Sequence, residues 1–302
     1  MKKLPIYLAL LATVAAAPQS PNPARVQQSH FFESPMLVGV VEEIDLRQEP
    51  FAEWFDAGYA EYSPAPEAIN ELRSALAAEG LTIEVFFGTW CDDSTRELPR
   101  LVRTLDAAAF GRDQLKMVAL SDNPGIFKTS PDSRERDLGI HRTPTIVVLR
   151  GDQEVGRIVE RPADSLEADL VAILDAAQPP LPYGAESALH ARYLSENTDL
   201  IRVPTTEFLD ELETLGDTDS LWHYAYYDLL FNNRPADAAD VLRIFLTLHD
   251  DDARGYRLLA QAESDLGNSG AALFAVRRAL AINPDSRAAR ELEKTILESV
   301  PE

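Results

Sequence analysis

The single cysteine of the chain, Cys91, lies in the segment Trp90-Cys91-Asp92-Asp93-Ser94. This segment separates an apolar run at residues 81–87, which predicts a buried strand, from an amphipathic stretch that predicts a helix over residues 91–109. A thiol at a helix N-terminus faces unpaired backbone N–H groups and the positive end of the helix dipole, which favours thiolate over thiol. Because thiolate is the species that reacts with disulfides, the residue and its position predict thiol–disulfide chemistry.

The elements around Cys91 predict an α/β domain. Short apolar runs predict strands at residues 36–41, 81–87, 115–120, 145–149 and 155–159. Gly151-Asp152 supplies the turn of a hairpin between the last two runs. Amphipathic stretches predict helices at residues 64–78, 91–109 and 166–177, and a polar, helix-prone stretch ends near Leu138. Strands and helices in this order favour a mixed sheet covered on both faces.

Two segments of the α/β region resemble the thioredoxin superfamily. Residues 86–91, Phe-Phe-Gly-Thr-Trp-Cys, are similar to its strand and active-site approach, and residues 139–149 are similar to its cis-proline loop and the strand that follows. The resemblance covers residues 36–178 and implies a thioredoxin-like fold. It also implies a cis peptide bond between Thr143 and Pro144, opposite Cys91. The Thr143 backbone would then hydrogen-bond an extended substrate chain, with Trp90 lining the same groove.

The sequence departs from the family's pattern at two positions. Ser94 stands where dithiol members have their second cysteine, and a hydroxyl cannot resolve a mixed disulfide. Val85 replaces the buried acidic residue of thioredoxins, so a proton relay through that position is absent. Asp92 and Asp93 place negative charge beside the sulfur, which opposes the helix dipole. A complete redox cycle within one molecule is therefore excluded, and any exchange involves a second molecule.

The last third of the chain resembles tetratricopeptide repeats. One helix-turn-helix unit is marked by Tyr256, Leu259, Ala260, Gly267, Ala272, Val276, Ala279 and Pro284. A degenerate copy begins 34 residues earlier at Trp222. It has Ala238 at the position equivalent to Ala272, and Asp250 where proline is expected. A charged helix at residues 286–298 would cap the stack. An unrelated helical hairpin bundle is the alternative.

Three functions remain open from these residues. In the first, Cys91 and Ser94 are catalytic: Cys91 exchanges disulfides as a monothiol, and Ser94 donates a hydrogen bond to the sulfur. Trp90, Thr143 and Pro144 would bind the substrate, and a low-molecular-weight thiol is a possible second reactant. In the second, the chain is a redox-inactive adaptor that binds a protein or peptide in the groove by Pro144 and on the repeats. In the third, Cys91 is only a packed residue at a helix start.

Other residues support weaker expectations. His141, Arg96 and Arg142 are candidates for tuning the thiol. The remaining histidines lack the spacing of metal ligands, so we expect neither a metal nor a cofactor. The net charge of −22 argues against nucleic acid and anionic membranes as partners.

The N-terminus predicts export. Two lysines, a short apolar run and a stretch of alanines indicate a signal peptide, either cleaved or retained as an anchor, and no later segment predicts a membrane span. We therefore expect a periplasmic or secreted protein. The expected organisation is a signal peptide (1–17), a flexible leader (18–35), a thioredoxin-like domain (36–178), a linker (179–204) and tetratricopeptide-like repeats with a capping helix (205–302).

Overall fold

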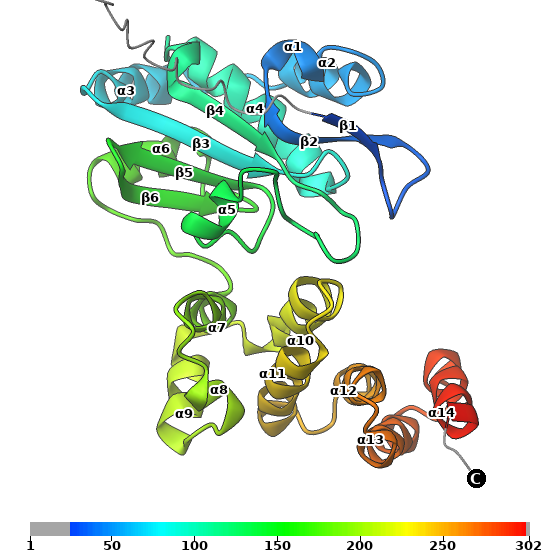
Figure 1. Cartoon of the computed structure of the whole chain (residues 1–302). Helices are drawn as coiled ribbons and strands as arrows, with labels where there is room; N and C mark the ends of the chain where they lie inside the picture. The colour runs from blue at the N-terminus through cyan, green and yellow to red at the C-terminus, as the bar shows by residue number, and fades with distance from the viewer. Residues whose placement is uncertain (1–24, 300–302) are drawn as a thin grey trace, which may run out of the picture.

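A computed structural model of the chain describes residues 25–299. The chain forms an α/β part built on a mixed six-stranded sheet, followed by a helical part that lies on one side of the α/β part (Figure 1). The expected signal peptide, residues 1–17, lies outside the described residues, as does the first portion of the expected leader.

The sheet has the strand order β1-β2-β4-β3-β5-β6. Strands β3 and β4 are parallel, whereas the other neighbouring pairs are antiparallel. The strands span Arg25–Gln28 (β1), Pro35–Val41 (β2), Leu81–Phe87 (β3), Leu115–Ala119 (β4), Thr145–Arg150 (β5) and Gln153–Val159 (β6). The five predicted strands are confirmed, as is the two-residue turn between β5 and β6, where Gly151 has a φ of 61°. Strand β1 lies in the segment expected to be a flexible leader.

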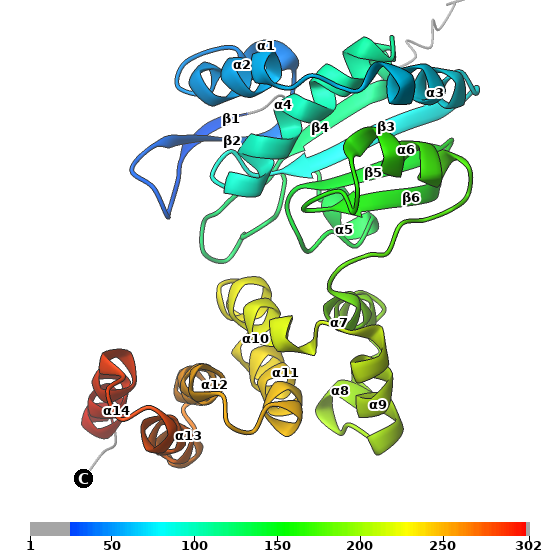
Figure 2. The same ribbon diagram turned by 180° about the vertical axis from the view of Figure 1, so that it is seen from behind.

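One face of the sheet is covered by helices (Figure 2). Alternate residues of β3, including Ile83 and Val85, pack with apolar side chains of these helices in one core. The helices of the α/β part span Glu43–Leu46 (α1), Ala52–Glu61 (α2), Pro66–Leu76 (α3), Asp92–Ala107 (α4), Arg134–Asp137 (α5) and Leu166–Leu174 (α6), with a 3₁₀ turn at Arg112–Gln114 (η1). Helices α3, α4 and α6 were predicted, and α1 and α2 were not.

The other face of the sheet is covered by the segment that connects β4 to β5. Phe86 and Val147 pack here with Ile140, beside the short helix α5. The charged Glu84 on the same face of β3 is buried and forms an ion pair with Arg134 of α5. This connecting segment also faces the helical part, so it forms the middle layer of the molecule (Figure 1).

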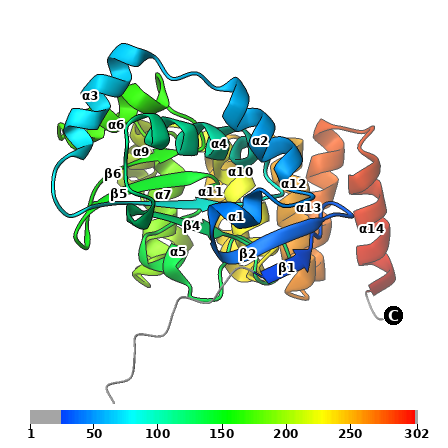
Figure 3. The same ribbon diagram turned by 90° about the horizontal axis from the view of Figure 1, so that it is seen from above.

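The helices of the helical part lie side by side in series below the α/β part in Figure 1, from α7 at one end to α14 at the other, and α14 lies beyond the sheet when seen from above (Figure 3). Helices α11 and α13 begin 34 residues apart, and each buries a small residue, Ala238 or Ala272, completely. The elements span Gly184–Leu194 (α7), Asp199–Arg202 (α8), Thr206–Leu215 (α9), Thr218–Ser220 (η2), Leu221–His223 (α10), Tyr224–Leu230 (η3, a π-helical segment), Pro235–Leu248 (α11), Ala253–Asp265 (α12), Ser269–Ile282 (α13) and Arg287–Ser299 (α14).

Helices also occupy the segment expected to be a linker. Helix α7 and the short helix α8 lie within residues 179–204, so the helical part begins earlier in the chain than the repeat pattern predicts. Helix α7 buries Ala185, Glu186 and Leu189. Within residues 25–299, no helix is both long and apolar enough to cross a bilayer.

Candidate functional site

Cys91 lies at the junction of β3 and α4, as its sequence position predicts. It is the N-cap residue of α4, and its backbone N–H donates to the Gly88 carbonyl at 3.0 Å. Cys91 is partly exposed. Its thiol donates a hydrogen bond to the backbone carbonyl of Thr143, with 3.3 Å between Sγ and the oxygen. The structure thus brings together two residues that are 52 positions apart in the chain.

The loop that carries Thr143 is held by several backbone contacts. The Thr143–Pro144 peptide bond is cis, which confirms the prediction. Thr145 Oγ1 donates to the Arg142 carbonyl at 2.8 Å, and the Glu160 N–H donates to the Pro144 carbonyl at 2.7 Å. The Thr143 side chain is buried, so this residue presents mainly its backbone to Cys91.

Ser94 has a different role from the one expected. Its side chain is fully buried, and its hydroxyl oxygen accepts a hydrogen bond from the Gly88 N–H at 3.2 Å. No hydrogen bond between Ser94 and the Cys91 sulfur is found in residues 25–299, so the predicted bond is not observed. Because Gly88 begins the turn that leads from β3 to Cys91, Ser94 ties α4 to that turn.

Trp90 belongs to an aromatic cluster formed by Phe31, Trp90, Phe127, Tyr227 and Phe231. Its indole N–H donates to the Leu120 carbonyl at 2.9 Å. The cluster joins the β1–β2 connection, the loop after β4 and the π-helical segment η3. Phe31 remains 41% exposed, so the cluster reaches the surface of the protein. The prediction that Trp90 lines a groove remains a prediction.

Three charged residues near the start of α4, Asp93, Arg96 and Glu97, are paired with one another. Arg96 donates to Asp93 and to Glu97, at 2.6 Å in each case, and Arg161 also contacts Asp93. Arg96 is therefore bound to carboxylates, and its main electrostatic effect is to neutralise the acidic first turn of α4.

A buried ionic network connects the Thr143 loop to the helical part, and it is formed by Arg142, Glu186, Glu160, Lys128 and Asp228. The Arg142 guanidinium makes a bidentate contact with Glu186 of α7, at 2.9 and 2.6 Å, and a further contact with Glu160 at 3.0 Å. Lys128 donates to both carboxylate oxygens of Asp228 in η3 and to the His141 carbonyl at 2.5 Å. Burial raises the pKa of Asp228 to about 6, although the Lys128 ammonium opposes this shift.

Three histidines line the same junction of the two parts. The rings of His141 and His190 lie 5.0 Å apart, and burial lowers the pKa of each to about 3. Burial also lowers the pKa of His223, to about 2. His141 contacts Ser187, and His190 contacts the Tyr224 hydroxyl at 3.0 Å. All three are neutral at pH 7. His141 contacts Ser187 and the His190 ring rather than the Cys91 thiol.

The side chains of Glu186, His223 and Asp228 come close enough to suggest a metal site, since their ligand atoms lie within 4.8 Å of one another. Both carboxylates, however, already bind cations: Arg142 donates to both oxygens of Glu186, and Lys128 donates to both oxygens of Asp228. A metal ion would have to compete with these two buried cations at short range. The three residues are therefore better described as part of an ionic network than as a metal centre.

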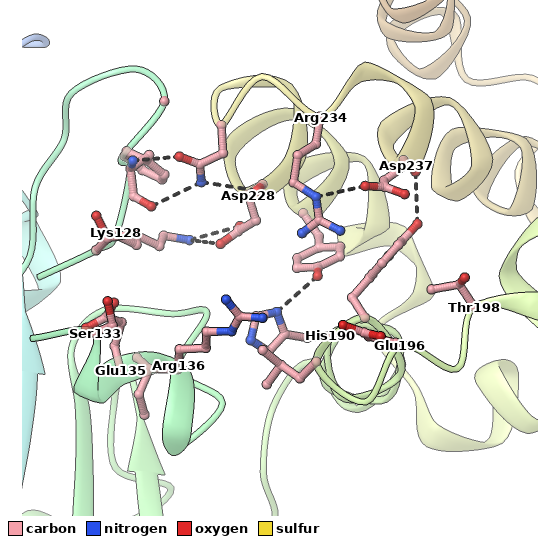
Figure 4. A pocket seen from close by; sticks show the side chains of 18 of the residues that line it. Lys128, Ser133, Glu135, Arg136, His190, Glu196, Thr198, Asp228, Arg234 and Asp237 are labelled. Atoms are coloured by element: carbon pink, nitrogen blue, oxygen red, sulfur yellow. Dashed lines mark hydrogen bonds and ion pairs between the residues drawn. The ribbon is translucent and has the colours of Figure 1, made fainter.

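A cavity of about 860 Å³ opens between the β4–β5 connection and the helical part (Figure 4). Lys128, Arg136 and Arg234 contribute positive charge, and Asp228 and Asp237 contribute negative charge. Figure 4 shows the Lys128–Asp228 pair reaching across from one part to the other. The cavity is thus polar and of mixed charge, and it lies next to the ionic network.

The ionic network could not be located from the sequence. The available signal was an acidic residue among apolar residues of a helix: Glu186 lies three residues before the buried Leu189, and Asp228 is flanked by Tyr227 and Leu229.

Comparison with known proteins identifies no relative, because no model of a known protein family matches the chain and no curated protein sequence matches it.

Proposed function

We propose that this chain is an exported, thioredoxin-like monothiol protein that exchanges disulfides through Cys91 and binds partners through a tetratricopeptide-like module. One observation carries the proposal: the partly exposed Cys91 thiol, at the start of α4, contacts the Thr143 carbonyl next to Pro144. This contact is the arrangement that the thioredoxin resemblance implies. The hairpin of β5 and β6 follows the same loop, which also agrees with the resemblance.

The proposed reaction needs one thiolate in this chain and a second thiol from outside. The Cys91 thiolate attacks one sulfur of a partner disulfide, so an S–S bond forms to Cys91 and the partner's S–S bond breaks. The second partner sulfur leaves as a thiolate and takes up a proton. A low-molecular-weight thiolate then attacks the partner's sulfur in the mixed disulfide, so the bond to Cys91 breaks, Cys91 leaves as a thiolate, and the small thiol is joined to the partner. A second small thiol can attack the sulfur of the first, which releases the partner thiol and forms a disulfide of the two small thiols. No second cysteine of this chain takes part, since the sequence has none.

The residues around Cys91 support specific roles in this exchange. The Thr143 backbone would receive the extended chain of the partner, and the aromatic cluster that includes Trp90 would contact its apolar side chains. Ser94 would act by holding the turn at Gly88, because its oxygen is bound there. The 34-residue spacing of α11 and α13 supports tetratricopeptide-like repeats as a second contact surface.

The test is the rate at which Cys91 forms a mixed disulfide with oxidised glutathione at pH 7, measured by mass spectrometry. The folded chain is expected to react at least about tenfold faster than the chain unfolded in urea, because the helix N-terminus favours the thiolate. A Cys91→Ala variant controls for adducts elsewhere. An equal or slower rate in the folded chain would refute the exchange function.

A redox-inactive adaptor is the second candidate, and the aromatic cluster favours it. Phe31 and Phe32 are 41% and 51% exposed and lie at the connection of β1 and β2, where an apolar peptide could dock. The two functions differ in their dependence on the sulfur. An adaptor captures its partner equally well as the Cys91→Ser variant, and it loses capture when Phe31 and Phe32 are replaced by serine.

A further inference from the structure

We propose that Glu186 and Asp228, two acidic residues of the helical part, are positioning residues that set the reactivity of Cys91 in the α/β part. They do so by holding residues 141–143 in place, so that the Thr143 carbonyl stays against the thiol. The inference rests on the proposed function for its consequence in disulfide exchange. Its effect on the thiol itself is measured independently of that function.

The first connection runs from Glu186 to the residue next to Thr143. The Glu186 side chain is fully buried on α7 and accepts two hydrogen bonds from the Arg142 guanidinium, at 2.9 and 2.6 Å. Ser220 donates to the same carboxylate at 3.0 Å, which fixes its orientation from the helical side. The Tyr183 ring lies 3.8 Å from the guanidinium carbon. Arg142 is therefore held between the two parts, and Thr143 follows it directly in the chain.

The second connection runs from Asp228 to the residue before Arg142. Asp228 in η3 accepts from Lys128 Nζ at 3.2 and 3.0 Å (Figure 4). The same ammonium donates to the His141 carbonyl at 2.5 Å. Lys128 itself is only 6% exposed, so this bridge lies inside the protein. The carbonyl of His141 and the side chain of Arg142 are thus fixed by different helical elements, η3 and α7.

The contact that these connections hold has a chemical consequence. A thiol can donate a hydrogen bond to the Thr143 carbonyl, whereas a thiolate cannot, and a carbonyl oxygen 3.3 Å from an anionic sulfur is unfavourable. The contact therefore favours the less reactive form of Cys91. It also keeps the Thr143 backbone in the place where a substrate chain would bind. Loosening the loop therefore removes the hydrogen bond that holds the thiol in its less reactive form, but it also displaces the Thr143 backbone from the place where a substrate chain would bind.

The isosteric variants Glu186→Gln and Asp228→Asn test the proposal with two reagents. Each variant is expected to raise the rate of reaction with one reagent and to lower the relative rate with the other. Alkylation of Cys91 by iodoacetamide at pH 7 is expected to rise by about two- to tenfold, the factor that corresponds to one hydrogen bond. Mixed-disulfide formation with an extended peptide disulfide, divided by the alkylation rate, is expected to fall by at least about the same factor. A fold that is merely loosened would raise both rates together.

The matched control is Glu263→Gln. Glu263 is also a buried glutamate of the helical part bound to an arginine, Arg243, but it lies on α12, away from the loop. This variant is expected to keep both rates. The proposal is overturned if the Glu186→Gln and Asp228→Asn variants keep the wild-type rates of alkylation and of mixed-disulfide formation.

Two further results separate the proposals from each other. If the wild type forms no mixed disulfide but the alkylation rates change as expected, the proposed exchange function fails and the positioning role stands. If one isosteric variant does not fold, the other is decisive, because the two carboxylates act through separate connections.

Discussion

Acidification is expected to destabilise the chain through the three histidines buried where its two parts meet. Burial lowers the pKa of His141 and His190 to about 3 and that of His223 to about 2, whereas each titrates near 6.5 in an unfolded chain. Below pH 6.5 the unfolded state therefore binds more protons than the folded state. The stability that the neutral histidines contribute is fully present above pH 6.5 and is lost as the pH falls toward 3.

Asp228 acts in the opposite direction over part of this range. Because burial raises its pKa to about 6, the folded state holds its proton between pH 6 and pH 3.8, where the unfolded carboxylate is still ionised. One pH unit corresponds to about 1.4 kcal/mol for each proton of difference. Three histidines opposed by one aspartate give a net loss of about 3–5 kcal/mol between pH 7.5 and pH 5. This loss is a large fraction of a typical folding free energy.

The assay is urea unfolding at pH 7.5, 6 and 5, followed by circular dichroism. The chain carries a net charge of −22, and protonation of surface carboxylates relieves repulsion over the same range, so each variant is compared with the wild type at each pH. His190→Gln is expected to reduce the loss by about 2 kcal/mol. His249→Gln controls for removal of an imidazole from the helical part outside this junction. The reasoning fails if His190→Gln shows the same pH dependence as the wild type.

Three substitutions test local features of the fold. Asp122→Ala removes the carboxylate that accepts from Ser29 Oγ and from the N–H groups of the next two residues, and is expected to cost about 2–4 kcal/mol; hydrogen exchange of residues 29–34 should accelerate, and unchanged exchange would contradict it. Gly184→Ala would place a Cβ 2.2 Å from the Leu215 carbonyl oxygen, so a lower Tm and a loss of about 1–3 kcal/mol are expected. Gly270→Ala, where an added Cβ meets nothing within 4 Å, is the matched helical control and is expected to gain about 0.5–1 kcal/mol in urea unfolding; equal effects of the two glycine variants would refute the contact argument.

The parts of the structure that the sequence predicted are those that depend on local pattern. The strand at residues 81–87 and the helix after Cys91 follow from a change in hydrophobic period. The position of the Thr143–Pro144 loop opposite Cys91 was implied by the family resemblance of two short motifs, but the hydrogen bond from the thiol to the Thr143 carbonyl was not predicted. Ser94 was expected to bond to the Cys91 sulfur, but its hydroxyl oxygen instead accepts from the Gly88 N–H, because the turn before Cys91 places that N–H next to it. Hydrogen-bond partners of this kind depend on backbone positions that no spacing rule specifies.

The interface between the two parts was beyond reach of the sequence for a different reason. Arg142 and Glu186 are 44 residues apart, and Lys128 and Asp228 are 100 residues apart. Each lies in a segment that shows no periodic pattern linking it to its partner. The pairs form only when the helical part docks on the β4–β5 connection, so their identity is a property of the assembled chain.

The buried ion pairs between the two parts also bear on how such a chain can arise and be engineered. Helical modules are often treated as interchangeable, but here the first helix of the helical part supplies Glu186, and a later segment supplies Asp228. A substituted helical part without acids at these two positions would leave the charges of Arg142 and Lys128 buried without their partners, at a cost of several kcal/mol. Recombination at residues 179–183 is therefore expected to yield stable chimaeras only from donors that carry both carboxylates, so the two parts have to be redesigned together.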